Sequence, residues 1–447
     1  MLHRFLPVLK IAAILFLTVL LLLPMARVRG LIQERQSLRD NVLEDVARSD
    51  AYAQTLTGPL LIVPYTRTLR ETEYDRDQRP VTVTREVSDE LRLLPELLDV
   101  AGQLATEERK RGIYRARVYR ADAQLTGHFE IPANYGVTED VESYRFGEPH
   151  LALGISDIRG IGNGLTLRTD GVDVPFQPGA ATSVLPSGVH TPLQSADVTL
   201  PQRMNYEIAL MLTGTGEFNV TPVGRETNVR LDSDWPHPAF VGEYLPRQRD
   251  ISSSGFAAQW QTSFFATNLH ELLTRCAEPG AEGCQAFHSR HFGVSFVDPV
   301  DHYLKSERAA KYAFLFIGLT FAGFFLTEVL RRVSVHPVQY GLVGLALAMF
   351  FLLLLSFSEH IGFAGAYAVS AAACVGLITF YVGHVLDSHA QGLGFGVGLA
   401  SLYGLLYGIL SSEDYALLMG SLLVFGLLAA VMVLTRRVSW SGMEVSR

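Results

Sequence analysis

The sequence contains two thiols whose spacing could support redox or metal chemistry. Cys276 and Cys284 stand eight residues apart in a polar loop rich in turn-forming residues. In an oxidising compartment two such thiols pair, and a ring this small stabilises the folded chain by about 2–3 kcal/mol on the loop-entropy model. Two free thiols and a metal-binding pair are the alternatives, but no neighbouring Cys or His completes a four-ligand spacing. We therefore predict a disulfide between Cys276 and Cys284 and no metal site.

Ionisable residues in the C-terminal third form a second candidate set. Glu328 stands inside an apolar segment, one turn before Arg331 and Arg332, and His336 follows at the start of the next segment. An ionisable group within hydrocarbon is costly and functional by default, but a side chain near the end of a span can reach water. The simplest expectation for Glu328 is therefore an ion pair with Arg331 or Arg332 on its own helix. A proton or ion relay is the alternative.

Glu359 and His360 place an acid beside an imidazole at the end of another apolar segment. A solvated turn is the simplest expectation, and a relay is again the alternative. Because Ile361–Phe363 is apolar, we expect this turn to lie at the membrane interface. Our hypothesis is that the acid and imidazole pair with each other, or bind a residue of the soluble domain, and so couple that domain to the membrane helices.

The sequence contains partial matches to two functional motifs, and neither match is complete. His270–Thr274 starts like a zinc-protease helix but lacks the second His, and Gly160–Gly164 lacks the spacing of a dinucleotide-binding turn. No Gly-x-Ser-x-Gly elbow and no Ser-x-x-Lys occurs. His288 and His291 are expected to be exposed loop residues rather than ligands. We assign no catalytic, cofactor-binding or metal-ligating residue and expect no cofactor.

The charged residues divide the chain of 447 residues into three parts. Of its 37 Lys+Arg and 45 Asp+Glu, residues 1–30 hold four basic and no acidic residues, and residues 311–447 hold six of each. The middle part, 31–310, is left with 27 basic and 39 acidic residues, a net charge of −12. This pattern predicts a membrane protein with a large acidic soluble domain. Nucleic acid is an unexpected partner, because phosphate recognition needs a basic surface.

Long apolar runs predict six membrane-spanning helices, with 1–30 as an anchor and 311–447 as a five-helix bundle. Each run approaches the roughly 20 apolar residues that cross a bilayer. The first could instead be a cleaved signal peptide, but Pro24 and Arg27 do not suit a cleavage site. The predicted spans are Ile11–Ala26, Ala313–Leu330, Val338–Phe357, Ala364–Leu386, Leu393–Leu410 and Tyr415–Leu434.

The basic residues near the span ends predict the orientation. Arg331 and Arg332 follow the second span, and Arg436 and Arg437 follow the last, whereas the turns at 356–363 and 411–414 contain no Lys or Arg. Lys and Arg favour the cytoplasmic side. We therefore expect both termini inside and residues 31–310 outside, in the periplasm of a Gram-negative bacterium.

The soluble domain begins with a predicted helix, Leu31–Ala53, and continues with segments rich in β-forming residues. Such strands in series indicate a mainly antiparallel α+β domain. The Pro/Gly/Ser-rich stretch 175–192 is its best internal boundary, and we leave open whether the domain is one unit or two. Asp301–Arg332 is predicted to form one helix into the second span. The predicted strands are Leu60–Tyr65, Val81–Thr84, Ile113–Tyr119, Gln124–Ile131, His150–Ile155, Tyr206–Leu212, Glu217–Val223 and Phe256–Phe265.

Several sequence blocks, in order along nearly the whole chain, resemble the bacterial inner-membrane protein CreD family. They are Leu31–Arg35 (LIQER), Gly58–Tyr65 (GPLLIVPY), Arg111–Tyr114 (RGIY), Asp234–Phe240 (DWPHPAF), Gly293–Asp301 (GVSFVDPVD), Ser306–Tyr312 (SERAAKY), His336–Tyr340 (HPVQY) and Ser358–Phe363 (SEHIGF).

The resemblance implies a cell envelope integrity protein of the inner membrane. The family is linked to tolerance of a DNase colicin and to a regulon that answers β-lactam and wall stress. It implies no catalytic activity, so no residue is carried over as a catalyst. The Cys276–Cys284 loop lies outside these blocks.

Three readings follow from the residues and the resemblance together. The first is a non-enzymatic envelope protein whose periplasmic domain acts at the envelope. Its expected partners are membrane lipid and, beyond it, envelope or wall components or other inner-membrane proteins. The second is a transporter or channel component built from the six spans. The third is a periplasmic envelope-modifying enzyme. A polar cavity in the bundle would favour the second reading, and a pocket with paired acids or a Ser/His pair would favour the third.

Overall fold

The computed structural model describes residues 6–74, 80–162, 164–194, 199–277, 281–296, 302–331, 335–411 and 416–435. The chain divides into two compact units. The helical unit comprises 1–40 and 300–447, and the β-rich unit comprises 41–299. The predicted domain 31–310 therefore includes two end segments, 31–40 and 300–310, that belong to the helical unit. The prediction rested on charge, which indicates that a segment is solvated but does not indicate which unit it packs against.

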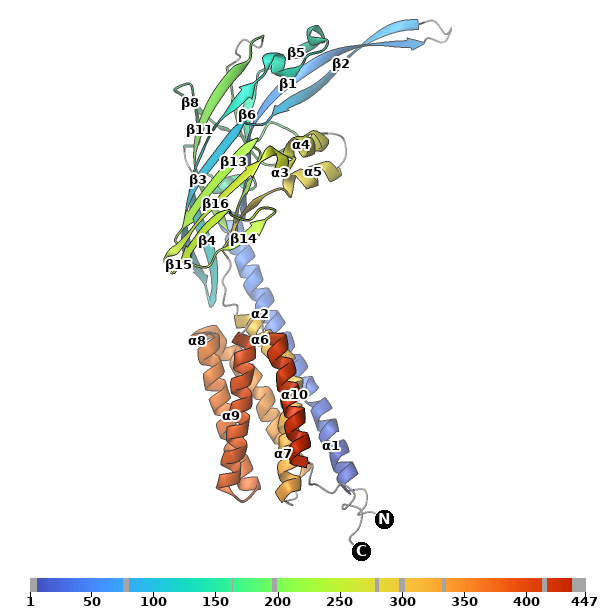
Figure 1. Cartoon of the computed structure of the whole chain (residues 1–447), viewed down its shortest axis with the longest axis vertical. Helices are drawn as coiled ribbons and strands as arrows, with labels where there is room; N and C mark the ends of the chain where they lie inside the picture. The colour runs from blue at the N-terminus through green and yellow to red at the C-terminus, as the bar shows by residue number, and fades with distance from the viewer. Residues whose placement is uncertain are drawn as a thin grey trace. The chain divides into compact units, whose positions relative to one another are not determined.

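The β-rich unit contains two sheets, visible in Figure 1. The first has the order β14-β17-β12-β1-β6-β10-β9, with β2 and β5 also paired to β1. Its strands are β1 (Gln54–Tyr74), β2 (Pro80–Leu93), β5 (Tyr144–Phe146), β6 (His150–Ile155), β9 (Gln177–Pro178), β10 (Gly188–Pro192), β12 (Glu217–Thr221), β14 (Ala239–Gly242) and β17 (Phe292–Ser295).

The second sheet has the order β15-β16-β13-β3-β4-β11-β7-β8. Among the described strands, β1 with β12 and β3 with β13 are the parallel pairs, and the other pairs are antiparallel, which confirms a mainly antiparallel β-rich domain. Its strands are β3 (Leu97–Arg111), β4 (Tyr114–Ile131), β7 (Thr166–Thr169), β8 (Val172–Pro175), β11 (Gln202–Thr215), β13 (Glu226–Ser233), β15 (Gln248–Ser252) and β16 (Gly255–Ser263).

The two predicted strands Ile113–Tyr119 and Gln124–Ile131 are one strand, β4. Its pairing with β11 runs without a break from Val118 to Ile131, so the polar residues between the predicted strands belong to the exposed face. The sequence patterns also did not predict β3 and β13. In β3 the buried and exposed residues alternate over its first half, and its second half is charged, which hides the alternation from a hydropathy pattern.

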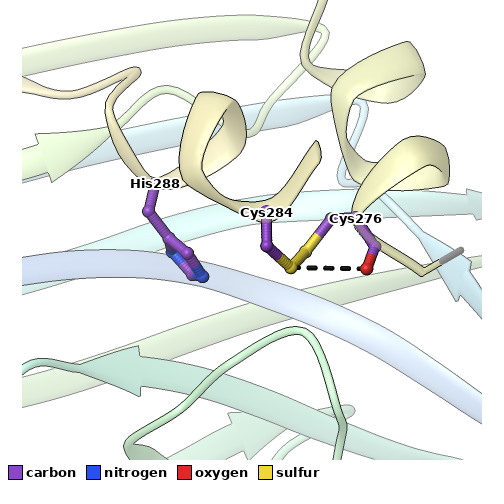
Figure 2. A group of neighbouring side chains, drawn as sticks. All are labelled: Cys276, Cys284 and His288. Atoms are coloured by element: carbon purple, nitrogen blue, oxygen red, sulfur yellow. Dashed lines mark hydrogen bonds between the residues drawn. A yellow bond between two sulfur atoms is a disulfide. The ribbon is translucent and has the colours of Figure 1, made fainter. Parts of the chain in front are cut away.

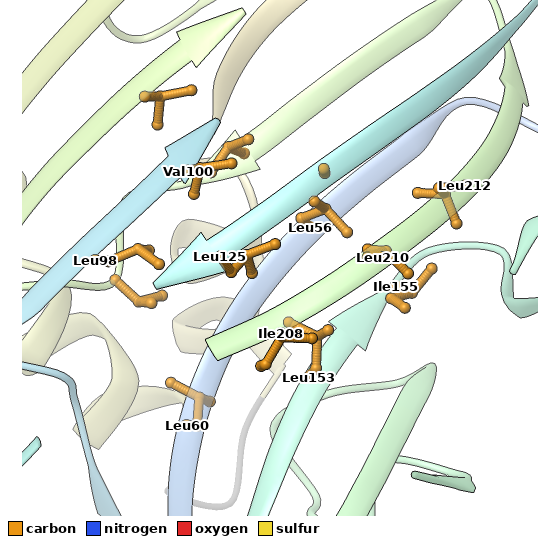
Figure 3. Packing of buried hydrophobic residues seen from close by; sticks show 14 of the residues in the cluster. Leu56, Leu60, Leu98, Val100, Leu125, Leu153, Ile155, Ile208, Leu210 and Leu212 are labelled. Atoms are coloured by element: carbon orange, nitrogen blue, oxygen red, sulfur yellow. The ribbon is translucent and has the colours of Figure 1, made fainter. Parts of the chain in front are cut away.

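Side chains from both sheets meet in one hydrophobic core (Figure 3). Leu56 and Leu153 come from the first sheet, and Leu125 and Ile208 come from the second. The core also contains Ala180, Val184, Leu185 and Val189. The stretch 175–192 therefore contributes to the shared core of the β-rich unit.

Three short helices, α3 (Phe264–Thr267), α4 (Leu269–Ala277) and α5 (Ala281–His288), follow β16. Helix α2 (Leu22–Ser49) begins in the helical unit, and its end belongs to the β-rich unit. There Leu43 and Val46 pack against Ala116 and Val118 of β4. This is the packing role expected for the predicted helix at 31–53, which in the structure ends at Ser49.

The remaining helices of the helical unit are α1 (Leu6–Leu20), α6 (His302–Lys311), α7 (Ala313–Arg331), α8 (Pro337–Val385), α9 (His389–Ser411) and α10 (Ala416–Thr435). Among the described residues, Ala12–Ser49, Pro337–Val385 and His389–Ser411 are long and apolar enough to cross a membrane. A fourth candidate is the pair of α6 and α7, which is bent by 46°. The predicted single helix Asp301–Arg332 is therefore wrong, because the chain changes direction between Lys311 and Ala313.

Helix α8 folds back on itself. Its Gly362 has φ 75° and ψ 166°, a conformation that is strained for any residue with a side chain. The Sγ of Cys374 donates to the carbonyl oxygen of Ala346 at 3.4 Å, yet 28 residues of straight helix would span about 42 Å. The two halves of α8 therefore lie side by side, in agreement with the predicted turn between Phe357 and Ala364.

Candidate functional site

Glu328 of α7 joins three helices of the helical unit. One carboxylate oxygen forms an ion pair with the Nζ of Lys10 on α1, and the other accepts a hydrogen bond from the hydroxyl of Tyr340 on α8 at 2.8 Å. Glu328 is 8% exposed and Tyr340 is fully buried. The expected pairing of Glu328 with Arg331 or Arg332 stays a prediction, and the contacts with Lys10 and Tyr340 are two that the sequence did not predict. The side chains of Arg331 and Arg332 lie outside the described residues.

Aromatic rings surround this cluster of Lys10, Glu328 and Tyr340. The ring centroids of Phe321 and Phe324 lie 5.6 Å and 4.8 Å from that of Tyr340. Both phenylalanines are fully buried. An apolar shell makes a lone charge costly, and it makes a paired and hydrogen-bonded charge hard to separate. We infer that this cluster stabilises the contact between α1, α7 and α8.

Glu359 forms a second cluster at the other end of the first half of α8. Its Oε1 accepts a hydrogen bond from the hydroxyl of Tyr303 on α6 at 3.1 Å and lies 3.8 Å from the Nε of Arg35 on α2. The guanidinium of Arg39 lies 5.7 Å from the centre of the Tyr303 ring. Glu359 therefore contacts the two helices, α2 and α6, through which the chain continues toward the β-rich unit.

The two residues of the predicted Glu359–His360 turn have different surroundings. The Glu359 side chain is only 10% exposed, so the expectation of a solvated turn is wrong for this residue. His360 is exposed, as expected of a turn. The partners of Glu359, Tyr303 and Arg35, were not among the predicted site residues, because nothing in their local sequence marks them.

His336 caps the N-terminus of α8. Its Nδ1 accepts a hydrogen bond from the backbone N–H of Val338 at 3.3 Å, and its own backbone N–H donates to the side-chain oxygen of Gln339 at 2.9 Å. Pro337 occupies the first helical position. These are the features of a capping box, so His336 has a local structural role in starting the helix.

Cys276 and Cys284 lie on two consecutive short helices of the β-rich unit. Cys276 belongs to the last turn of α4, Cys284 belongs to α5, and the two are joined by a disulfide in the structure. His288 is one helical turn beyond Cys284, and its side chain lies beside the sulfurs (Figure 2). It is half-buried at the end of α5, which corrects the expectation of an exposed loop residue. Burial lowers the pKa of this imidazole below its ordinary value, because removal from water penalises the charged form.

The described part of the β-rich unit includes two cavities that could hold a small ligand. One, of about 270 Å³, includes Tyr135, Asp170 and Arg203 in its lining. The other, of about 470 Å³, lies over the second sheet and includes Asp99 and Arg230. Each of these linings contains a single carboxylate and no His, Ser or Cys. Neither cavity therefore brings together the paired acids or the Ser/His pair that hydrolytic chemistry would use.

Comparisons with known proteins give a match over almost the whole chain. A family model described as inner membrane protein CreD matches residues 7–441. The protein named inner membrane protein CreD from Escherichia coli K12 is 36% identical over 431 residues, which cover 96% of this chain and 93% of that protein. A crystal structure of an M1 zinc metallopeptidase from Deinococcus radiodurans aligns with 38% of this chain and 39% of its own, at 10% identity and a TM-score of 0.20. That score is too low to support any inference.

Proposed function

The chain belongs to the CreD family of inner membrane proteins, and from that premise we propose that it acts at the cell envelope without catalysing a reaction. In this proposal residues 31–310 are periplasmic, and six spans anchor them. The periplasmic domain supports the envelope under colicin and β-lactam stress, in contact with membrane lipid and with envelope or wall components or other inner-membrane proteins. No cofactor is required.

The observation that carries this proposal is the pairing of Glu328 and Glu359, two acids of the helical unit that are mostly shielded from solvent. Glu328 holds Lys10 and Tyr340, and Glu359 holds Tyr303 and lies near Arg35. An acid in a proton or ion pathway must exchange partners during each cycle. An acid that forms ion pairs or hydrogen bonds with several helices at once is suited to stabilising the contact between those helices.

The envelope role can be tested by complementation. Cells that lack their own family member are transformed with the full chain, and survival in a DNase colicin and in a β-lactam is measured. We expect the chain to raise survival of at least one stress. Unchanged survival in both, with the chain present in the membrane, would contradict the proposal.

A Lys10→Met/Glu328→Gln variant separates this proposal from a transporter. It removes both charges and keeps an acceptor for the Tyr340 hydroxyl. If the acid only fastens helices, this variant should complement as well as the unchanged chain. A stable variant that fails to complement would favour a relay through Glu328.

We predict that the turn at 411–414 faces the periplasm and that the N-terminus of α9 faces the cytoplasm. The reason is the distribution of Lys and Arg, although Arg436, Arg437 and residues 412–415 lie outside the described residues. In a Cys374→Ser background, Ser412→Cys should react with a membrane-impermeant thiol reagent added from outside. His389→Cys should react only after lysis. The reverse labelling pattern would overturn the orientation of the last two spans.

We predict that Glu359→Leu loosens the contact between α8 and the two helices α2 and α6. The substitution removes the carboxylate that accepts a hydrogen bond from the Tyr303 hydroxyl, and loss of a hydrogen bond to a charged group costs about 1.5–3 kcal/mol. Protease cleavage within α6, measured in membranes, should therefore become about tenfold faster. The exposed neighbour gives the control, since His360→Gln should leave the rate unchanged. Equal cleavage rates for Glu359→Leu and the unchanged chain would contradict a role of Glu359 in holding α8 against α2 and α6.

A further inference from the structure

We propose that Cys276, Cys284 and His288 form a site for a thiophilic metal ion of the Zn²⁺ class, which can be occupied only when the two cysteines are reduced. The disulfide and the metal need the same two sulfur atoms, so the oxidised form excludes the ion. The site is thereby gated by the thiol redox state. This inference does not depend on the proposed envelope function.

The geometry of the three ligand atoms supports the proposal. The two Sγ atoms and a ring nitrogen of His288 all lie within 4.8 Å of one another. Typical lengths of about 2.3 Å for Zn–S and about 2.0–2.1 Å for Zn–N place the ligand atoms of a tetrahedral site roughly 3.5–3.8 Å apart. The present separations, all within 4.8 Å, are close to that spacing once the sulfur–sulfur bond opens.

The helices present these ligands in a way that the sequence spacing did not reveal. Cys284 and His288 are four residues apart on α5 and so lie on the same face of the helix. Cys276 reaches them from the last turn of α4 (Figure 2). The three ligands do not follow a standard four-ligand spacing, which is why the sequence pattern predicted no metal site.

The scaffold beneath the ligands is anchored in the core. Leu273 of α4 and Phe287 of α5 are 2% and 0% exposed and belong to the main hydrophobic cluster. Cys276 is buried, whereas Cys284 and His288 are half-buried. The ligands are thus held by packed helices, and Cys284 and His288 keep part of their surface exposed. Three protein ligands leave a fourth position for water, as in sites that exchange ligands.

The reduction step balances with a dithiol as reductant. The dithiol gives two electrons and two protons to the sulfur–sulfur bond, which breaks to give two thiols, and the reductant leaves as its own disulfide. Binding of the ion then releases the two thiol protons to solvent, because thiolates are the ligands. In the reverse exchange a small disulfide accepts two electrons from the two thiolates, takes up two protons and leaves as a dithiol, and the ion is released.

The test uses the full chain in detergent, with Co²⁺ as a spectroscopic probe that Zn²⁺ displaces. Protein isolated from an oxidising compartment is alkylated without reduction and examined by mass spectrometry. We expect Cys276 and Cys284 to be unmodified, and this oxidised form to bind no Co²⁺ at the site. After reduction and removal of the reductant without oxygen, we expect one Co²⁺ per chain with a thiolate charge-transfer band.

Three variants decide the ligand set. Cys276→Ser with Cys284→Ser should abolish the charge-transfer band. His288→Ala keeps both sulfurs and should weaken Co²⁺ binding by at least tenfold, whereas His270→Ala, which changes an exposed histidine of α4, should bind like the unchanged chain. The proposal is overturned if the reduced chain binds no more Co²⁺ than the double Ser variant, or if His288→Ala binds with unchanged affinity. Free thiols in the native protein, or equal binding before and after reduction, would overturn the redox gate.

Discussion

Lys10→Met is expected to destabilise the helical unit by about 3–5 kcal/mol. The substitution removes the Lys10 cation that pairs with Glu328 beside Tyr340, and loss of one partner of a buried ion pair has this effect in other proteins. The free energy of unfolding can be followed by thermal or detergent-induced denaturation of the purified chain. The unfolding midpoint should fall by several degrees.

The pairing itself can be separated from the removal of a lysine. Lys10→Met/Glu328→Gln removes both charges of the pair, so it should recover most of the stability that the single variant loses. Lys311→Met is the matched control, since Lys311 is 63% exposed and pairs with Glu307 on the same helix. Such surface pairs contribute about 0–1 kcal/mol. A Lys10→Met variant as stable as Lys311→Met would contradict a stabilising role of the cluster of Lys10, Glu328 and Tyr340.

Gly392→Leu is expected to separate α9 from the second half of α8. A Cβ at Gly392 would lie 2.5 Å from the Cα and 2.8 Å from the backbone N of Gly383. Both of these atoms belong to the backbone, so no side chain can rotate away. Small residues let membrane helices approach closely, and forcing a large side chain into such a contact costs typically about 1–3 kcal/mol or more. The expected result is a lower unfolding midpoint and faster proteolysis of the α8–α9 loop.

Gly394 provides the control for this prediction. It lies two residues further along α9, is exposed, and a Cβ there would have nothing within 4 Å. Gly394→Leu should therefore be neutral or slightly stabilising, because Leu has the higher helix propensity. If both substitutions lower the midpoint equally, the loss reflects the apolar surface of α9 and not its packing on α8.

Some features of this protein could be predicted because they are local properties of the chain. Runs of about 20 apolar residues mark helices that can enter a membrane wherever they pack. Short runs of β-forming residues between turn residues mark strands such as β6 and the first half of β1 in the same way. The family was also predicted from sequence blocks distributed along the chain, and the comparisons confirm it.

The tertiary structure decided which of the reactive residues meet. Glu328 binds Lys10 across 318 residues of sequence, and Glu359 binds Tyr303 across 56, so neither pairing follows from helical spacing. His288 follows Cys284 by one turn of the same helix, but only the packing of α4 against α5 brings Cys276 to these two residues. The periodicity and charge of a segment indicate whether its side chains require an apolar or a polar environment. The partner that satisfies a buried charge or a third ligand position depends on how separate segments pack, and that information does not reside in any one segment.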